Sequence, residues 1–282
     1  VFAADWDNLL ILDACRYDDF ETRHDLEGHL EHRISRGAVS GEFLKRNFGG
    51  ENHYDIVYVT ANPWVSYFAG DKYEFHKIVP LWKTHWNKDL KTVHPSDVGA
   101  ATIRAHEQSP NQRIISHFMQ PHQPFIGNRA HSELGSLSGN LDIRHIVEET
   151  GQGTELDREN EFTHVWHLLK SGQIDAETLR SYSRENLDLV LNYVEDLLEK
   201  LNERTVVTAD HGQMFGEFAS PFPFRVYGHT DKFHTRALVK VPWLVAQGSE
   251  RKQVTAERPK SSEAANAEDG MRKKLEQLGY LE

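Results

Sequence analysis

The chain of 282 residues is long enough for one large domain or two small ones with a substantial core, and 38% hydrophobic residues exclude wholesale disorder. Its 43 acidic and 32 basic residues give a net charge of −11, which argues against broad binding of nucleic acid or anionic membranes and still allows a local basic pocket for a small anion. The single cysteine, Cys15, excludes an internal disulfide and is typical of a reducing compartment, so we expect a cytoplasmic protein unless a leader precedes Val1. No apolar run reaches the roughly 20 residues of a membrane span.

Five short apolar runs predict buried strands, at 8–12, 55–60, 113–119, 205–209 and 241–246. Helical patterns alternate with them, beginning near Gly41 and near Asp97 and spanning 176–200, with Asp175 as the expected N-cap of the last. Such alternation indicates an α/β domain with a mostly parallel central sheet flanked by helices. We expect one domain over 1–282, with a loop and helical excursion at 126–172 and a flexible segment at 248–269 before a C-terminal helix.

Polar residues follow several of these strands, and ligands of open α/β sheets bind beyond the carboxyl ends of the strands. Asp13 follows the first run, and Asp210 and His211 follow the fourth. Carboxylate and imidazole ligands together suit Zn²⁺, Mn²⁺ or Mg²⁺. Adjacent Asp and His can reach one ion only across a sharp bend, which we expect Gly212 to permit.

Four segments, in this order, resemble the alkaline phosphatase superfamily and are most similar to its sulfatase-like branch: "NLLILDACRYDDF", "HFMQPHQPF", "TVVTADHGQMFGE" and "YGHTDKFHTRALVKVPWLV". The resemblance covers the chain from about residue 8 to its end, and "TADHGQMFGE" is its most specific part. It implies a three-layer α/β sandwich. It also implies a divalent metal ion held by Asp13, Asp210, His211 and a nucleophile.

The resemblance further implies active-site roles for His122 and His229 and places Lys232 near a substrate-binding lysine. Where the family often has a second Asp, this chain has Ala14, which favours one tightly held ion. A weaker second site built from His117, His122 and His229 stays open. His117 lies inside a strand pattern and is nearly as well explained as a core residue.

The nucleophile is the weakest part of the pattern. Sulfatases convert a Cys or Ser in a C/S-x-P-x-R motif, which is absent between Asp13 and the second strand, and Cys15 is better explained by packing at a strand end. Ser40 precedes a short helix, where free N–H groups and the helix dipole favour an anion, and a metal-bound serine oxygen is a competent nucleophile. Ser40 could instead have only a structural role, as the N-cap of this helix. Ser35 and Thr60 are the alternative nucleophiles.

These observations predict a metal-dependent hydrolase of phosphate esters ahead of sulfate esters, with Ser40 as nucleophile and a small-molecule, glycan-linked or lipid-linked substrate. A phospho-alcohol transferase, a phosphomutase and a non-catalytic metal-binding module are the alternatives. We expect no nucleic-acid partner, and the oligomeric state stays open.

Overall fold

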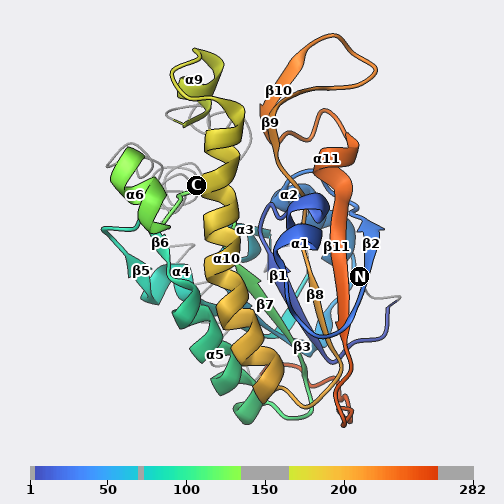
Figure 1. The fold of residues 1–282 in the computed structure, drawn as a ribbon. Coiled ribbons are helices and arrows are strands. Elements are labelled where there is room, and N and C mark those ends of the chain that lie inside the picture. Colours follow the sequence, from blue (N-terminus) through green and yellow to red (C-terminus); the bar gives the residue numbers. More distant parts are fainter. Residues whose placement is uncertain (1–3, 69–72, 135–164, 260–282) are drawn as a thin grey trace, which may run out of the picture.

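Seven strands form one mixed sheet at the centre of the protein (Figure 1). The computed structural model describes residues 4–68, 73–134 and 165–259. The strand order is β2-β11-β8-β1-β7-β3-β4, and every neighbouring pair is parallel except the two that involve β11. The strand bounds are β1 Asn8–Leu12, β2 His29–Ile34, β3 His53–Thr60, β4 Phe75–Pro80, β7 Arg113–Phe118, β8 Thr205–Thr208 and β11 Lys240–Ala246.

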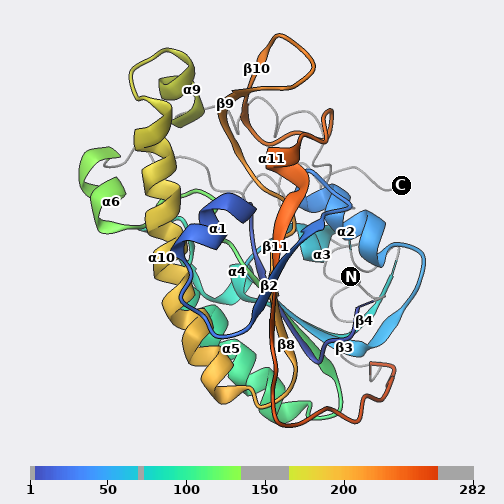
Figure 2. The same ribbon diagram turned by 45° about the vertical axis from the view of Figure 1, so that its right-hand side comes forward.

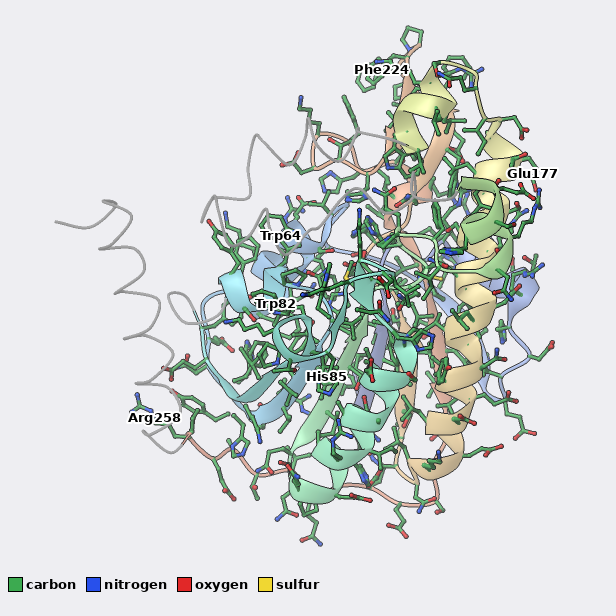
Figure 3. All side chains as sticks on the ribbon, turned by 90° about the vertical axis from the view of Figure 1, so that its left-hand side faces the viewer. Trp64, Trp82, His85, Glu177, Phe224 and Arg258 are labelled. Carbon is green, nitrogen blue, oxygen red and sulfur yellow. The ribbon has the colours of Figure 1, made fainter. Side chains whose placement is uncertain are left out.

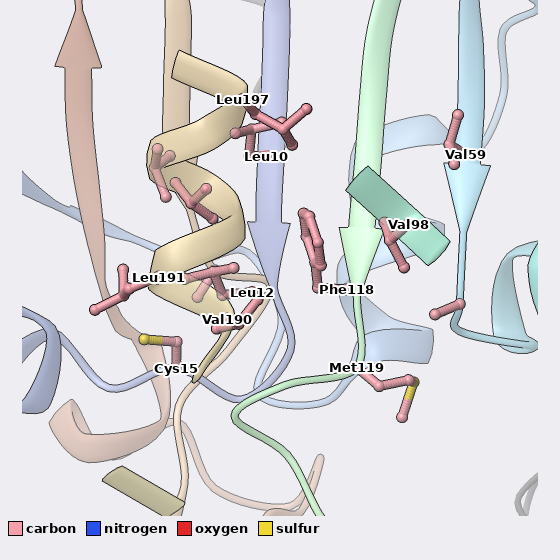
Figure 4. Packing of buried hydrophobic residues seen from close by; sticks show 14 of the residues in the cluster. Leu10, Leu12, Cys15, Val59, Val98, Phe118, Met119, Val190, Leu191 and Leu197 are labelled. Atoms are coloured by element: carbon pink, nitrogen blue, oxygen red, sulfur yellow. The ribbon is translucent and has the colours of Figure 1, made fainter. Parts of the chain in front are cut away.

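Helices cover both faces of this sheet, because successive side chains of a strand point to opposite sides. In β1, Leu10 and Leu12 lie in the core that includes residues of α5 (Pro95–Gln108) and α10 (Ala176–Lys200), as Figure 4 shows in part. Leu9 and Ile11 lie in a second core with Phe43, Leu44 and Phe48 of α2 (Ser40–Phe48). The two cores make the arrangement a three-layer sandwich, which confirms the expected fold class.

The five strands predicted from apolar runs are confirmed as β1, β3, β7, β8 and β11, and all five lie inside the sheet. The sequence patterns missed β2 and β4, which form its two edges. β2 reads "HLEHRI" and has no buried residue, so it lacks the apolar signal by which the other strands were found. The helix at 176–200 is confirmed as α10, and the Asp175 side chain accepts a hydrogen bond from the N–H of Thr178.

Shorter elements complete the fold. They are α1 Tyr17–Arg23, α3 Trp64–Phe68, α4 Leu81–Thr84, α6 Asn128–Leu134, α9 Val165–Lys170 and α11 Arg236–Val239, with two-stranded pairs of β5 Trp86–Asn87 with β6 Thr92–Val93 and of β9 Met214–Phe218 with β10 Arg225–Gly228. The β9–β10 hairpin projects past α11, away from the body of the sheet (Figure 2). None of the helices in the described ranges is both long enough and apolar enough to cross a bilayer.

Part of the predicted excursion at 126–172, residues 260–269 of the predicted flexible segment and the predicted C-terminal helix lie outside the described residues. The segment that follows β11 is described as far as residue 259 and contacts the edge of the sheet where the strands begin. The N–H of Thr255 donates to the carbonyl of Asn111, and Arg251 pairs with Asp5 and Asp7.

Candidate metal centre and active site

Buried polar side chains converge where four neighbouring strands end. They are Asp13 after β1, Ser40 at the start of α2, Asn62 after β3, His117 in β7, and Asp210 and His211 after β8. Each is at most 7% exposed, and the strand order places β8, β1, β7 and β3 side by side. Residues separated by as many as 198 positions therefore form one cluster because the parallel strands end at one edge.

Ser40 lies at the centre of this cluster. Its hydroxyl donates to Oδ2 of Asp210 at 2.6 Å and lies 3.4 Å from Oδ2 of Asp13 and 3.3 Å from Nε2 of His211. The N-cap of α2 is Val39, and it makes no side-chain cap hydrogen bond. Ser40 is therefore not the N-cap of α2. It is the first helical residue, and its hydroxyl faces Asp13 and Asp210.

The two alternative nucleophiles are engaged elsewhere. The Ser35 hydroxyl donates to the backbone carbonyl of Asp210 and accepts from the N–H of Gly37. The Thr60 hydroxyl donates to the carbonyl of Asn62 and accepts from its N–H, which closes the turn after β3. Both hydroxyls hold backbone near the site, whereas that of Ser40 contacts the carboxylates.

Asp13, His117 and Asp210 form a buried candidate site for a metal ion. One potential ligand atom from each lies within 4.8 Å of the others. Nε2 of His117 is 3.8 Å from Oδ2 of Asp13 and 3.7 Å from Oδ2 of Asp210, and within the described ranges it is a buried atom with no hydrogen-bond partner. Nε2 of His211 lies 3.6 Å from Asp13 and 3.5 Å from Asp210. Two carboxylates with the imidazole of His117, and with that of His211 within 3.6 Å of both carboxylates, are a donor set that fits a divalent cation.

The environment of Asp210 keeps it ionised. Burial acts to raise the pKa of this carboxyl, but His211, His117 and the Ser40 hydroxyl together hold the pKa below its ordinary value. Its Oδ1 accepts hydrogen bonds from the N–H groups of His211 at 2.8 Å and Ala14 at 3.1 Å. These two bonds direct the second oxygen, Oδ2, towards Ser40.

The backbone of Ala14, whose N–H donates to Asp210, has an unusual conformation. Ala14 has φ 58°, in the left-handed region that costs a non-glycine residue energy. This conformation accompanies the N–H bond to Asp210. The position where the family often has a second Asp therefore contributes a backbone donor to the site.

Gly212 has a different role from the one predicted. Its φ is not in the left-handed range, so the bend does not depend on glycine's conformational freedom. Instead, a Cβ at this position would lie 2.1 Å from the carbonyl oxygen of Ala237, and its N–H donates to the carbonyl of Leu238. Glycine is required because the chain after β8 passes directly against α11.

Three histidine rings form a continuous group beside the carboxylates. The ring centroid of His229 is 4.6 Å from that of His211 and 5.2 Å from that of His122. Nδ1 of His211 donates to the carbonyl of Gly212 at 2.8 Å, and Nδ1 of His122 donates to that of Gln123 at 2.6 Å. A carbonyl only accepts, so these bonds set the tautomer and leave the chemistry of both rings to Nε2.

A second set of contacts holds His229. Its Nδ1 is 3.3 Å from Oε1 of Gln213, whose backbone carbonyl accepts a hydrogen bond from Arg16 at 3.1 Å. The Arg16 guanidinium also pairs with Asp18 and with Glu217, so it lies beside the site and is neutralised by acids outside it. Gln213 was not recognised from the sequence, although it is the third residue after Asp210.

Asn62 was also missed. Its amide donates to Oδ2 of Asp13 at 2.7 Å and to Ser40 Oγ at 3.2 Å. It follows the end of β3 within two residues, so the strand-end rule that selected Asp13 could have selected it too. His117, which the sequence left open between core and site, lies against the carboxylates.

Lys232, which the resemblance placed near a substrate-binding lysine, is not one of the buried residues of the cluster. Lys232 is exposed, in the loop between β10 and α11. Cys15 is fully buried in the core, and burial, together with nearby acids, raises the pKa of its thiol well above the usual range. A neutral, buried thiol is a poor nucleophile, which agrees with its interpretation as a packing residue.

Comparison with solved structures identifies the fold. The soluble domain of lipooligosaccharide phosphoethanolamine transferase A from Neisseria meningitidis matches 85% of this chain and 75% of its own length, with a TM-score of 0.51 and 11% identity. The C-terminal periplasmic domain of EcEptC from Escherichia coli, in complex with Zn, matches 88% and 74%, with a TM-score of 0.46 and 11% identity. Phosphonate monoester hydrolase from Silicibacter pomeroyi matches 89% and 69%, with a TM-score of 0.47 and 12% identity.

No protein-family model matches the sequence, and no curated protein matches it either. At this level of identity the likeness concerns the fold. The chain has the fold of the alkaline phosphatase/sulfatase superfamily, which confirms the resemblance inferred from its motifs.

Proposed function

We propose that this chain is a metal-dependent enzyme that hydrolyses phosphate esters, phosphodiesters and phosphomonoesters ahead of sulfate esters, through Ser40. One observation carries the proposal: the Ser40 hydroxyl is 2.6 Å from Asp210, 3.3 Å from His211 and 3.4 Å from Asp13. A hydroxyl held against two buried carboxylates and an imidazole, at the first residue of a nine-residue helix, is arranged for nucleophilic attack on an anionic ester.

Asp13, Asp210 and His211 would hold the ion, with His117 as a further ligand whose Nε2 is directed at both carboxylates. When bound, a divalent ion supplies positive charge that polarises the ester and lowers the pKa of the serine hydroxyl. The N-terminal N–H groups of α2 add donors for the phosphoryl oxygens.

The reaction at Ser40 has two steps. The serine hydroxyl, whose pKa a bound ion would lower, loses its proton to solvent, and the Oγ–P bond forms as the P–O bond to the leaving alcohol breaks. When protonated, the rings of His122 and His229 can donate to the developing negative charge on the phosphoryl and leaving oxygens. Water then attacks the phosphoserine and the Oγ–P bond breaks; the proton that the attacking water loses goes to the Ser40 oxygen, which restores the hydroxyl.

Phosphorus is favoured over sulfur because Ser40 does not lie in a motif that is converted to formylglycine. The same phosphoserine could be released by an alcohol in place of water, and one protein of the same fold is described as a phosphoethanolamine transferase. Transfer to an acceptor alcohol is therefore the second candidate function.

The test measures hydrolysis of p-nitrophenyl phosphate, bis(p-nitrophenyl) phosphate, a p-nitrophenyl phosphonate and p-nitrophenyl sulfate, with Mn²⁺, Zn²⁺ or Mg²⁺. The variant is Ser40→Ala, and Ser183→Ala, at a buried serine of α10, is the matched control. We expect turnover of one phosphorus ester in wild type and Ser183→Ala and its loss in Ser40→Ala, with metal binding retained. A phosphoserine that is trapped without release, and that an added alcohol discharges, assigns the transferase. Metal binding with neither turnover nor phosphoserine contradicts both and leaves a binding module.

A further inference from the structure

The turn of the β9–β10 hairpin exposes an unusual amount of aromatic surface. Of the five large hydrophobic side chains that the described residues expose, three lie in the seven residues 218–224: Phe218 is 55% exposed, Phe222 50% and Phe224 42%. In Figure 3, Phe224 lies at the extreme end of the molecule. We name Phe218, Phe222 and Phe224, with the neighbouring Phe233, the aromatic tip.

Three rings of the aromatic tip pack against one another. The centroids of Phe222 and Phe224 are 5.7 Å apart and nearly parallel, at 19°. Phe233, from the loop before α11, lies 5.1 Å from Phe224 and 6.0 Å from Phe222. The guanidinium of Arg225 lies 4.5 Å from the ring centroid of Phe218. The rings therefore form one organised apolar surface, as expected of a binding surface.

The backbone of the turn has its hydrogen-bond donors satisfied internally. The N–H of Ala219 donates to Phe224, that of Ser220 to Phe218 and that of Phe222 to Ala219, all to carbonyl oxygens. Pro221 and Pro223 have no N–H. Residues 219–223 thus offer no N–H to a partner strand, which disfavours pairing with a sheet edge of another protein. A segment without unsatisfied donors enters an apolar phase at low cost.

The charge around the aromatic tip differs from that of the whole chain. Residues 214–236 contain three basic residues, Arg225, Lys232 and Arg236, and two acidic residues, Glu217 and Asp231, whereas the chain as a whole carries 43 acidic against 32 basic residues. All three basic side chains are exposed. Salt screens charges beyond about 8 Å, so this projecting part of the molecule meets a surface through the charges of residues 214–236 more than through those of the body.

We propose that the aromatic tip inserts into the headgroup region of an anionic lipid bilayer, with Arg225, Lys232 and Arg236 contacting lipid phosphates. Exposed aromatic rings combined with basic side chains are the combination that binds such interfaces. The hairpin begins at Met214, four residues after Asp210, and ends at Gly228, directly before His229, so its base adjoins the candidate site while its aromatic tip projects away from it. The expectation from the net charge, no broad binding to anionic membranes, then applies to the body and not to this projection.

Vesicle binding requires no turnover, so this inference is tested separately from the proposed reaction. The full chain is sedimented with vesicles of phosphatidylcholine and with vesicles of phosphatidylcholine mixed with phosphatidylglycerol, at low and high salt. The variant is Phe222→Ser with Phe224→Ser. The matched control is Ile34→Ser, which removes the most exposed large hydrophobic side chain of the described residues, at 64%, from the edge strand β2.

We expect wild type and Ile34→Ser to bind the anionic vesicles more tightly than the neutral ones and to be released by salt. We expect the double variant to bind them at least about tenfold more weakly, since each ring buries apolar area on insertion. Its unfolding by urea, and its hydrolysis of a soluble ester if the proposed function holds, should be unchanged.

Three results overturn the proposal. The first is absence of vesicle binding by wild type, and the second is equal binding by the double variant and Ile34→Ser. The third is a wild-type dimer in sedimentation velocity that the double variant loses while no vesicle binds, which would assign the aromatic tip to a second copy of the chain.

Discussion

The hydroxyl of Ser40 donates to Oδ2 of Asp210 at 2.6 Å, although 170 positions separate the two residues in the sequence. Two backbone N–H groups hold the other oxygen of the same carboxylate. Asp210 therefore has a fixed orientation: backbone N–H groups bind its Oδ1, and its Oδ2 faces Ser40. This division suggests how the candidate metal centre can be dissected.

Asp210→Asn should weaken metal binding by roughly 100-fold or more, because the amide lacks the charge that a divalent ion requires of its ligand. Ser40→Ala should retain most of the metal affinity while losing turnover, since it removes the nucleophile and leaves both carboxylates. Competition between the protein and a chromogenic chelator for Zn²⁺ or Mn²⁺ would measure the affinities. Unchanged affinity in Asp210→Asn would place the ion elsewhere.

Tyr58 offers a test of the position of His117. Its hydroxyl is 3.1 Å from Nδ1 of His117, and for Nε2 to bind a cation Nδ1 must donate its proton to this oxygen. Burial raises the pKa of Tyr58 well above its ordinary value, so the hydroxyl stays neutral. We expect Tyr58→Phe to reduce metal affinity by about 10-fold to 100-fold in the same assay.

Tyr73→Phe is the matched control for this prediction. Tyr73 packs in the same core cluster as Tyr58, and its buried hydroxyl has no hydrogen-bond partner in the part of the chain that the structure describes. Its substitution should leave metal affinity unchanged. Equal losses in the two variants would indicate a general effect of the core and argue against ligation by His117.

Gln213→Glu should extend activity to higher pH. The substitution places a carboxylate against Nδ1 of His229, which favours the protonated, donating form of the ring. Gln213→Leu removes the acceptor and should lower activity without moving the profile upwards. The measurement is the dependence of kcat/KM on pH. Identical profiles in wild type and Gln213→Glu would show that His229 is not the proton donor proposed above.

Gly212→Ala should destabilise the protein by about 1–3 kcal/mol, because its Cβ would lie 2.1 Å from a backbone oxygen of α11 that must then move. Gly99→Ala is the control: this glycine lies inside α5 with no atom within 4 Å of an added Cβ, and alanine should stabilise the helix by up to about 1 kcal/mol. Urea unfolding measures both, and equal effects would contradict the close approach at Gly212.

The contact of Glu203 with His106 should make stability depend on pH. Burial acts to raise the pKa of Glu203, but the His106 ring at 2.8 Å and the Asn8 amide hold it below the ordinary 4.5. A lowered carboxyl pKa contributes stability that is present above 4.5 and is lost as pH falls through the lower, folded value. Glu203→Gln should therefore be less stable than wild type near pH 6, with a difference that narrows in acid. A difference independent of pH would show that the carboxylate charge is not responsible.

The sequence alone determined the layers of this protein. The five strands buried within the sheet appear as apolar runs, and α10 appears as a long amphipathic pattern with a capping Asp175, because burial imposes a strict local periodicity. The edge strands β2 and β4 escaped because an edge is only partly buried and carries polar residues. The strand-end rule also located Asp13, Asp210 and His211, since the polar residues that follow parallel strands lie at the same edge of the sheet.

Only the tertiary structure decided which side chains meet at that edge. It brought Ser40, and not Ser35 or Thr60, against the carboxylates, and it added Asn62 and His117, which come from neighbouring strands and share no motif with Asp210. It also showed that position 212 requires glycine because the backbone there passes close to α11, and that Lys232 is exposed beside the aromatic tip. Such contacts depend on strand order and register, which arise from long-range pairing and leave no local periodicity in the sequence.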